Sequence, residues 1–242
     1  MPLSRLIAHD IAMMNFLANG LFLLLVTFLV AVMYVAFTRT AQGPSFRQFR
    51  ITIAAVTGFW LVLTASVAAT GFYADFQSMP PRFLTLLIPP LIGLIFLYRS
   101  HAIASLLGSF TQSQLIGLQS FRIIMEFILW LLYLEGKMPV QMTFEGRNFD
   151  IIVGLTAPLL AQFIIRGNIS NKVIILWNVL CMLILANTVI TAALSAPTPF
   201  RVFMNEPANT VIAYFPFVWL PAFVVPFAFA LHLLSIKKAL IR

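Results

Sequence analysis

The chain has 242 residues, of which 61% are hydrophobic and only 9% are charged. Soluble domains carry about 25% charged residues, so this composition excludes a soluble globular protein. The formal net charge of +8 does not indicate a nucleic-acid-binding protein, because the basic residues lie singly or in short groups between apolar runs, as charges that flank membrane helices do.

Long apolar runs follow one another from near the first residue to near the last. A helix of about 20 apolar residues crosses a bilayer. We therefore expect an all-α membrane protein in which residues 1–242 form one domain of seven transmembrane helices. The first run is too long for the apolar core of a cleavable signal peptide. The predicted spans cover residues 12–37, 50–73, 82–98, 115–135, 149–166, 173–195 and 210–236.

Prolines interrupt two of the predicted spans. The third carries Pro89 and Pro90 at its centre, and the seventh carries Pro216, Pro221 and Pro226. Proline removes a backbone hydrogen bond and bends a helix, so both spans should be kinked. Residues 100–112, between the third and fourth spans, are too few to cross the bilayer and fit an amphipathic segment on the membrane surface.

The loops on the two sides of the predicted bundle differ in charge. One set contains nine Lys and Arg residues and no acidic residue, whereas the alternate set contains five basic residues together with six acidic ones. Basic residues near helix ends favour the cytoplasmic side. We therefore expect the N-terminus outside and the C-terminus in the cytoplasm, in the plasma (inner) membrane. The nine are Arg39, Arg47, Arg50, Arg99, Arg166, Lys172, Lys237, Lys238 and Arg242.

Short similarities between the two ends of the chain suggest a weak internal repeat. An Asp-Ile pair opens the first span at Asp10 and the fifth at Asp150, and prolines lie within the third and seventh spans. This pattern predicts a parallel 3+1+3 arrangement, as some transporters have. The span count, the outside N-terminus and the length resemble the general layout of SWEET-type sugar transporters in topology alone. The prolines typical of that family are missing from the first two spans, so no residue role is carried over.

The fourth span carries a polar and aromatic stripe on an otherwise apolar helix. At 3.6 residues per turn the stripe occupies an arc of roughly 80°, which should point into the bundle. Arg122 and Glu126 lie four residues apart and can pair along the helix. Two interpretations stay open: a polar site on a substrate or ion pathway, or a structural pair in which Arg122 extends to the cytoplasmic surface. The pathway candidates are Gln119, Arg122, Glu126, Trp130 and Tyr133.

The outer loop over residues 135–150 is the longest polar interruption on its side. Its charged residues could converge over the mouth of the bundle. The simpler interpretation is that Asn148 caps the fifth helix and Asp150 lies favourably in its first turn. The candidates for the outer mouth are Glu145, Arg147, Asn148 and Asp150.

The sixth span also has a polar face. Cys181, Asn187, Thr188, Thr191 and Ser195 lie within about 120° of arc on a helix. Small polar residues on one side of a membrane helix usually serve helix–helix packing, and the alternative is that they line a polar cavity.

No catalytic or cofactor motif is present in the sequence. The single cysteine, Cys181, excludes an intramolecular disulfide and a CxxC metal site. The motifs HExxH and GxSxG and glycine-rich phosphate loops are missing. His101 and His232 are both predicted near the cytoplasmic side, where they could approach each other. We expect no enzymatic activity, no metal and no cofactor.

These features favour a small secondary transporter or a channel-like protein, with Glu126 on the fourth helix responding to protons or cations and Arg122 as its partner or as a contact for anions. The alternative is a non-transporting seven-helix protein, either a receptor-like sensor or a subunit of a larger membrane complex. Short, basic cytoplasmic loops offer a sensor little surface for passing on a signal, which favours transport. The expected partners are the lipid bilayer and an unidentified small molecule or ion, but not nucleic acid. Homo-oligomers and larger complexes stay open.

Overall fold

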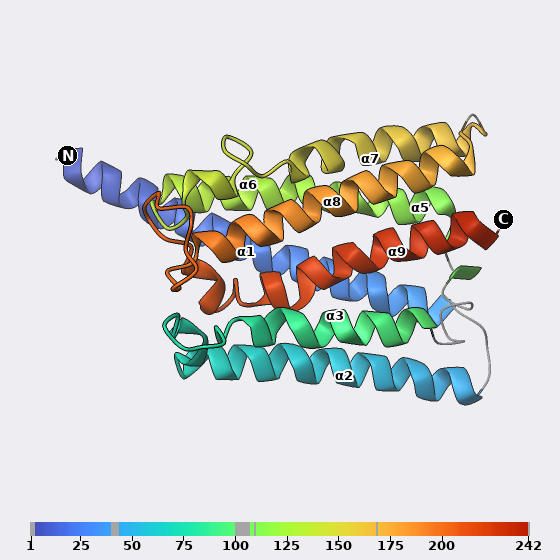
Figure 1. The fold of residues 1–242 in the computed structure, drawn as a ribbon, viewed down its shortest axis with the longest axis horizontal. Coiled ribbons are helices and arrows are strands. Elements are labelled where there is room, and N and C mark those ends of the chain that lie inside the picture. Colours follow the sequence, from blue (N-terminus) through green and yellow to red (C-terminus); the bar gives the residue numbers. More distant parts are fainter. Residues whose placement is uncertain (1–2, 40–43, 100–106, 109, 168, 242) are drawn as a thin grey trace.

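The protein is a bundle of helices that lie alongside one another (Figure 1). A computed structural model describes residues 3–39, 44–99, 107–108, 110–167 and 169–241. Within these ranges the regular structure is helical and contains no strand, which confirms the all-α prediction. The α-helices are α1 (Leu3–Arg39), α2 (Pro44–Ala69), α3 (Leu84–Arg99), α5 (Gln112–Gly117), α6 (Phe121–Leu134), α7 (Asp150–Ile165), α8 (Asn171–Ser195) and α9 (Val225–Ile241).

Five helical stretches in the described ranges are long and apolar enough to cross a membrane, which indicates an integral membrane protein. Two further apolar helices, α3 and α7, are shorter. Sixteen residues rise about 24 Å, against a hydrocarbon core of about 30 Å. The five long stretches are Ile11–Ala36, Arg50–Ala69, Gln112–Leu134, Asn171–Ser195 and Leu220–Ile241.

The boundaries of two predicted spans, the fourth and the seventh, need correction. The fourth span begins earlier, at Gln112, where Thr111 and Gln114 form a capping box, and a 3-10 turn (η2, Leu118–Ser120) separates α5 from α6. The seventh predicted span starts at residue 210, but after a single 3-10 turn (η4, Val211–Ala213) the continuous helix begins only with a π-helical segment (η5, Leu220–Val224) that continues into α9. The fifth predicted span, 149–166, agrees with α7 to within one residue at each end. Most of the predicted surface segment over 100–112 lies outside the described residues.

At the start of α9, a proline leaves a backbone carbonyl without its usual helical hydrogen bond. Pro226 has no N–H to donate to the carbonyl of Ala222, four residues earlier. The indole Nε1–H of Trp60 in α2 donates to this carbonyl at 2.9 Å. In return, Trp219 Nε1–H donates to Leu61 O of α2, also at 2.9 Å. Trp60 thus satisfies a carbonyl of the irregular segment, as a membrane interior requires, and Trp219 ties the same segment to α2.

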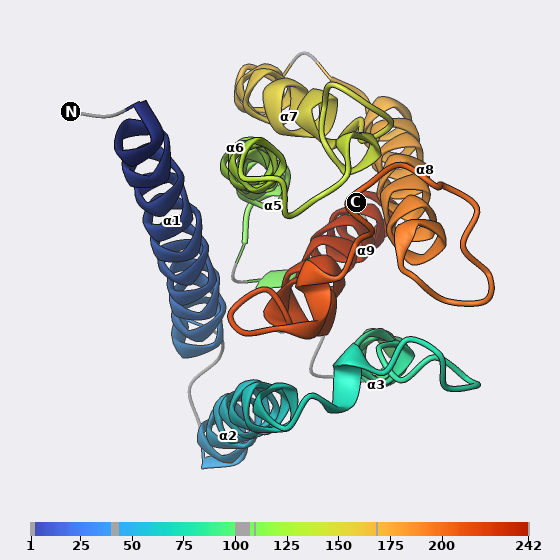
Figure 2. The ribbon, with the colours of Figure 1, turned by 90° about the vertical axis from the view of Figure 1, so that its left-hand side faces the viewer.

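The core lies between α1, α6 and α9, with α9 near the centre of the bundle (Figure 2). Phe22 and Leu29 of α1, Leu132 of α6 and Leu231 of α9 are buried in one apolar cluster. In contrast, α2 exposes Phe59 and similar side chains along its outer side, as expected for a helix facing lipid.

The helices α6 and α7, which carry Arg122 and Asp150, approach each other at a glycine. A Cβ atom added to Gly154 of α7 would lie 2.7 Å from Ile123 Cγ1 and 2.9 Å from the backbone nitrogen of Ile123 in α6. Only a residue without a side chain allows this approach. Ile123 directly follows Arg122, so the contact also fixes the distance across which Arg122 reaches α7.

Candidate functional site

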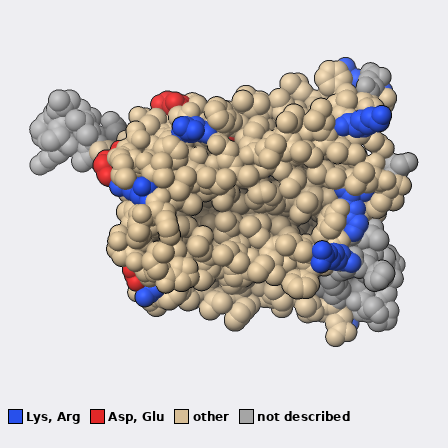
Figure 3. Space-filling model, viewed as in Figure 1, with Lys and Arg blue, Asp and Glu red and all other residues tan. Residues whose placement is uncertain are grey.

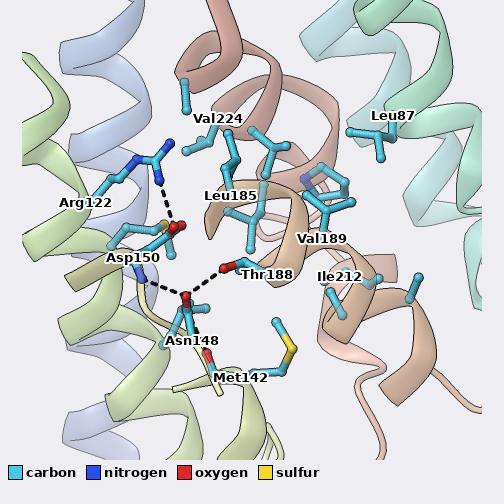
Figure 4. A pocket seen from close by; sticks show the side chains of 18 of the residues that line it. Leu87, Arg122, Met142, Asn148, Asp150, Leu185, Thr188, Val189, Ile212 and Val224 are labelled. Carbon is cyan, nitrogen blue, oxygen red and sulfur yellow. Dashed lines mark hydrogen bonds and ion pairs between the residues drawn. The ribbon is translucent and has the colours of Figure 1, made fainter. Parts of the chain in front are cut away.

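A pocket of about 190 Å³ lies between α3, α6, α8, the start of α7 and the η5–α9 segment. Figure 4 shows its walls, with Leu87 of α3 facing Leu185 and Val189 of α8. Ile190 lines the pocket and is 58% exposed, so the pocket reaches the outer face of the bundle. A hollow is visible near the middle of that face in Figure 3. Most lining residues are apolar, and the polar ones are Arg122, Glu126, Asn148, Asp150 and Thr188.

Arg122 is held by three helices although it is only 2% exposed. Its Nη1 lies 2.7 Å from Asp150 Oδ1 at the start of α7, and Figure 4 shows this ion pair at the edge of the pocket. Its Nη2 lies 3.3 Å from His232 Nε2 of α9, and its Nε donates to Gln119 Oε1 at 3.2 Å. The predicted pairing of Arg122 with Glu126 is therefore wrong, because Asp150 takes the guanidinium.

His232 connects the arginine to a second polar group. A guanidinium only donates, so His232 Nε2 must accept and the ring proton lies on Nδ1. Nδ1 faces Asn178 Oδ1 of α8 at 2.9 Å. Asn178 Nδ2 donates to Ser235 Oγ at 2.8 Å, and Gln112 Nε2 donates to the same oxygen at 2.6 Å. This hydrogen-bond pattern makes His232 a neutral imidazole.

Sequence reasoning missed His232, Asn178, Ser235 and Gln112 as members of this network. The signal was present for His232, Asn178 and Ser235, since each is a polar residue inside a predicted apolar span, whereas Gln112 lies just before the predicted fourth span. Their convergence was hidden because they come from α5, α8 and α9, whose mutual rotation no sequence spacing gives. The predicted approach of His232 to His101 falls on a residue outside the described part.

Asn148 organises the opposite side of the pocket, and Figure 4 shows its contacts. Its Oδ1 accepts from the Asp150 backbone N–H at 3.1 Å and from Thr188 Oγ1 at 2.8 Å. Its Nδ2 donates to Met142 O at 3.1 Å and to Glu126 Oε1. All four hydrogen-bonding positions of the amide are used. The predicted N-cap is off by one residue, because the N-cap position of α7 is Phe149; Asn148, one residue earlier, accepts from the first N–H of α7 and also donates to Glu126.

Among the described residues that line the pocket, Glu126 has a buried side-chain oxygen without a hydrogen-bond partner, as does Gln112, at Oε1, in the network outside the lining. It is 1% exposed and lines the pocket. Its Oε1 accepts from Asn148, and its Oε2 has no hydrogen-bond partner within the described part of the chain. Buried polar atoms are nearly always hydrogen-bonded, so an exception at a pocket wall indicates a place for a ligand's donor.

The residues of the predicted stripe on the fourth span differ in their surroundings before and after Glu126. Gln119 is buried and donates to Ala228 O of α9 at 3.2 Å. Trp130 and Tyr133 are only partly buried and do not line the pocket. Trp130 instead donates to Glu145 Oε1 at 2.8 Å and lies against the Phe144 ring.

The four outer-mouth candidates also differ in whether they line the pocket. Glu145 and Arg147 are exposed, and the Arg147 guanidinium lies 5.1 Å from the centre of the Phe203 ring. Neither residue lines the pocket, whereas Asn148 and Asp150 do. Two of the four candidates therefore line the pocket, and their convergence over an outer mouth stays a prediction.

The polar face of α8 serves both packing and the pocket. Asn187 Nδ2 donates to Arg147 O at 2.9 Å, which ties α8 to the outer loop. Ser195 accepts from Gln141 Nε2 at 3.0 Å. Thr191 is buried outside the pocket lining, and Thr188 alone of these residues reaches the pocket.

The polar side chains that line the pocket could bind a ligand through charge and hydrogen bonds. In the ranges that the structure describes, no group of three or more His, Cys, Asp or Glu side chains could hold a metal ion.

The profile of one protein family, described as "Domain of unknown function (DUF8737)", matches residues 79–240. The matched part contains every pocket residue named above, and α1 and α2 precede it. No curated protein and no solved structure matches the chain.

Proposed function

We propose that this chain, which belongs to the DUF8737 family, is a small membrane transporter that carries a solute through the pocket beside α6. The observation that carries the proposal is the unused oxygen of Glu126 at the wall of an apolar pocket. An apolar pocket with a few convergent polar groups is the usual form of a small-molecule site. Ionisable residues inside a membrane are costly to keep, so they commonly mark substrate or ion pathways.

The irregular start of α9 supports a protein that changes conformation. Leu220, Pro221 and Val224 of the π-helical segment η5 line the pocket. Single π-helical turns are often found at functional sites, and proline is a common cause of helix kinks. A bend in η5 would change the pocket and the helix that carries His232 together, which is what alternating access requires.

The arrangement of the helices supports seven passes. The chain termini lie at opposite ends of the bundle, and α3 and α7 run alongside the five long helices (Figure 1). On the face in Figure 3 the acidic side chains lie toward the end where α1 begins, while the charged side chains at the other end are basic. This asymmetry favours an outside N-terminus in the plasma (inner) membrane. The weak 3+1+3 repeat stays a prediction.

The orientation can be tested with single cysteines in a Cys181→Ser background. Cysteines at Gln77, Glu145 and Asn205, which are exposed, should react with an impermeant thiol reagent added to intact cells. Cysteines at the exposed Ser170 and Leu240 should react only after the cells are opened. The reverse pattern would contradict the orientation, and a mixed pattern would contradict the seven passes.

Transport can be tested in liposomes with a panel of small organic solutes whose uptake is followed by mass spectrometry. Protein-containing liposomes should take up at least one solute faster than empty ones. Val189→Trp should abolish this uptake, because the indole would fill the pocket that Val189 lines. The matched control is Val179→Trp on the exposed side of the same helix, which should leave uptake unchanged.

Two results would contradict the proposal. Uptake that persists in Val189→Trp would exclude this pocket as the route. A folded protein that moves no solute of the panel would favour the alternative of a sensor or a subunit of a membrane complex.

A further inference from the structure

Charge in the pocket wall is not balanced. The charged residues that line the pocket are Arg122, Asp150 and Glu126. Arg122 and Asp150 form an ion pair, so their charges cancel. His232 also faces Arg122, and its hydrogen bonds require the neutral form of the imidazole. One carboxyl group, that of Glu126, is therefore in excess. An isolated carboxylate in such a site is costly, so it needs either a proton or a cation from outside the chain.

The geometry points to a small organic cation as the solute: we propose that the pocket binds a monocationic amine whose ammonium group donates to Glu126 Oε2 while its apolar body lies along the pocket wall. This inference rests on the proposed function, because it names the substrate class for the same pocket. Binding exchanges one charge for another. The protonated carboxyl group of Glu126 gives up its proton, the carboxylate accepts hydrogen bonds from the ammonium group, and one proton leaves for each cation bound.

The apolar wall of the pocket favours a cation whose remaining part is apolar. Met125, Met138 and Met142 line the pocket with Leu129, Leu185 and Val224. Methionine side chains are flexible and polarizable, and they adapt to ligands of varied shape. The pocket volume of about 190 Å³ is somewhat larger than the roughly 150 Å³ of a cavity that admits benzene. An amine with one aromatic ring fits this space.

Other classes of solute fit less well. An anion would need a site with an excess of positive charge, but Asp150 already neutralises Arg122 and the carboxyl group of Glu126 lies in the same wall. An inorganic cation would need several oxygen ligands, whereas the amide of Asn148 is fully used. A sugar would need many hydrogen-bonding partners, and the wall is mostly apolar.

The test compares three probes of nearly equal shape: benzylamine as the cation, benzyl alcohol as the neutral form and benzoate as the anion. Calorimetry on the purified full chain in detergent should show that benzylamine binds roughly tenfold or more tightly than benzyl alcohol, as one charge-assisted hydrogen bond provides. Titrations in buffers of different ionisation enthalpy should show the release of about one proton per benzylamine, the stoichiometry of a cation exchanged for a proton at a single carboxyl group.

Two variants separate the charge of Glu126 from the shape of the pocket. Glu126→Gln should reduce benzylamine affinity to the level of benzyl alcohol and abolish proton release. Val189→Trp should abolish the binding of both probes. The inference is overturned if wild-type protein binds benzyl alcohol or benzoate as tightly as benzylamine, or if Glu126→Gln keeps the preference for the amine.

These outcomes can be told apart from failure of transport. If other solutes enter liposomes through the pocket but benzylamine shows no preference, the proposed substrate class is wrong and transport stands. If benzylamine binds with the expected dependence on Glu126 but does not cross the membrane, the cation site stands and transport is wrong.

Discussion

Replacing Arg122 with methionine is expected to lower the free energy of unfolding by about 3–5 kcal/mol, the cost of removing one partner from a buried ion pair. The loss arises because Asp150, buried at the start of α7, would be left without its counter-charge. Methionine keeps much of the length of the side chain, so lost packing contributes little. Unfolding of the purified protein in detergent, followed by circular dichroism, would measure the change.

The partner of Arg122 can be identified by rescue. The double variant Arg122→Met, Asp150→Leu should recover much of the lost stability, because removing both charges leaves neither one stranded. The matched control is Arg122→Met, Glu126→Leu, which should recover little since Glu126 makes no ion pair with Arg122 in the structure. Equal recovery in the two double variants would contradict the assignment of Asp150 as the partner.

Gly154→Val is expected to lower the free energy of unfolding by about 3 kcal/mol, at the upper end of the range for overpacked cores. The new Cβ would meet the backbone nitrogen of Ile123 at 2.9 Å, and a helix backbone cannot move aside as a flexible side chain can. The helices α6 and α7 would have to separate, which would also lengthen the ion pair between Arg122 and Asp150. Thermal unfolding in detergent would report the loss.

Gly93 in α3 offers the matched control for this substitution. A Cβ atom there meets no atom within 4 Å, so Gly93→Val should change the stability by only a few tenths of a kcal/mol, the scale of helix propensity differences. If Gly93→Val were as destabilising as Gly154→Val, the effect would reflect valine in a membrane helix rather than the contact between α6 and α7.

The role of the buried network follows from its distribution over the bundle. Gln112, Arg122, Asp150, Asn178 and His232 belong to α5, α6, α7, α8 and α9, one residue from each helix. Most of the other buried residues of these helices are apolar, so hydrophobic burial alone would tolerate many rotations about the helix axis. The hydrogen bonds that link these residues, in part through Ser235 of α9, are compatible with far fewer rotations, and they thereby fix how the helices face one another around the pocket.

Sequence alone determined the fold class and most helix positions, because both depend on local properties. An apolar run of sufficient length predicts a membrane helix without reference to any other part of the chain. The same is true of the buried stripe at Gln119, Arg122 and Glu126, which follows from the helical period. Where local rules compete, the prediction was less accurate. The start of the seventh span was placed ten residues too early, since apolar composition does not distinguish a helix from an irregular, proline-containing segment.

Only the tertiary structure decided which polar groups meet. Glu126, four residues from Arg122, was a reasonable partner by spacing, yet Asp150 binds the guanidinium because Gly154 lets α7 approach α6 closely. His232 joins the network from 110 residues away, and Trp60 satisfies a carbonyl that Pro226 leaves free. Such pairings depend on the rotation and contact distance of whole helices. These are set by the packing of many side chains together, and no spacing within one helix contains them.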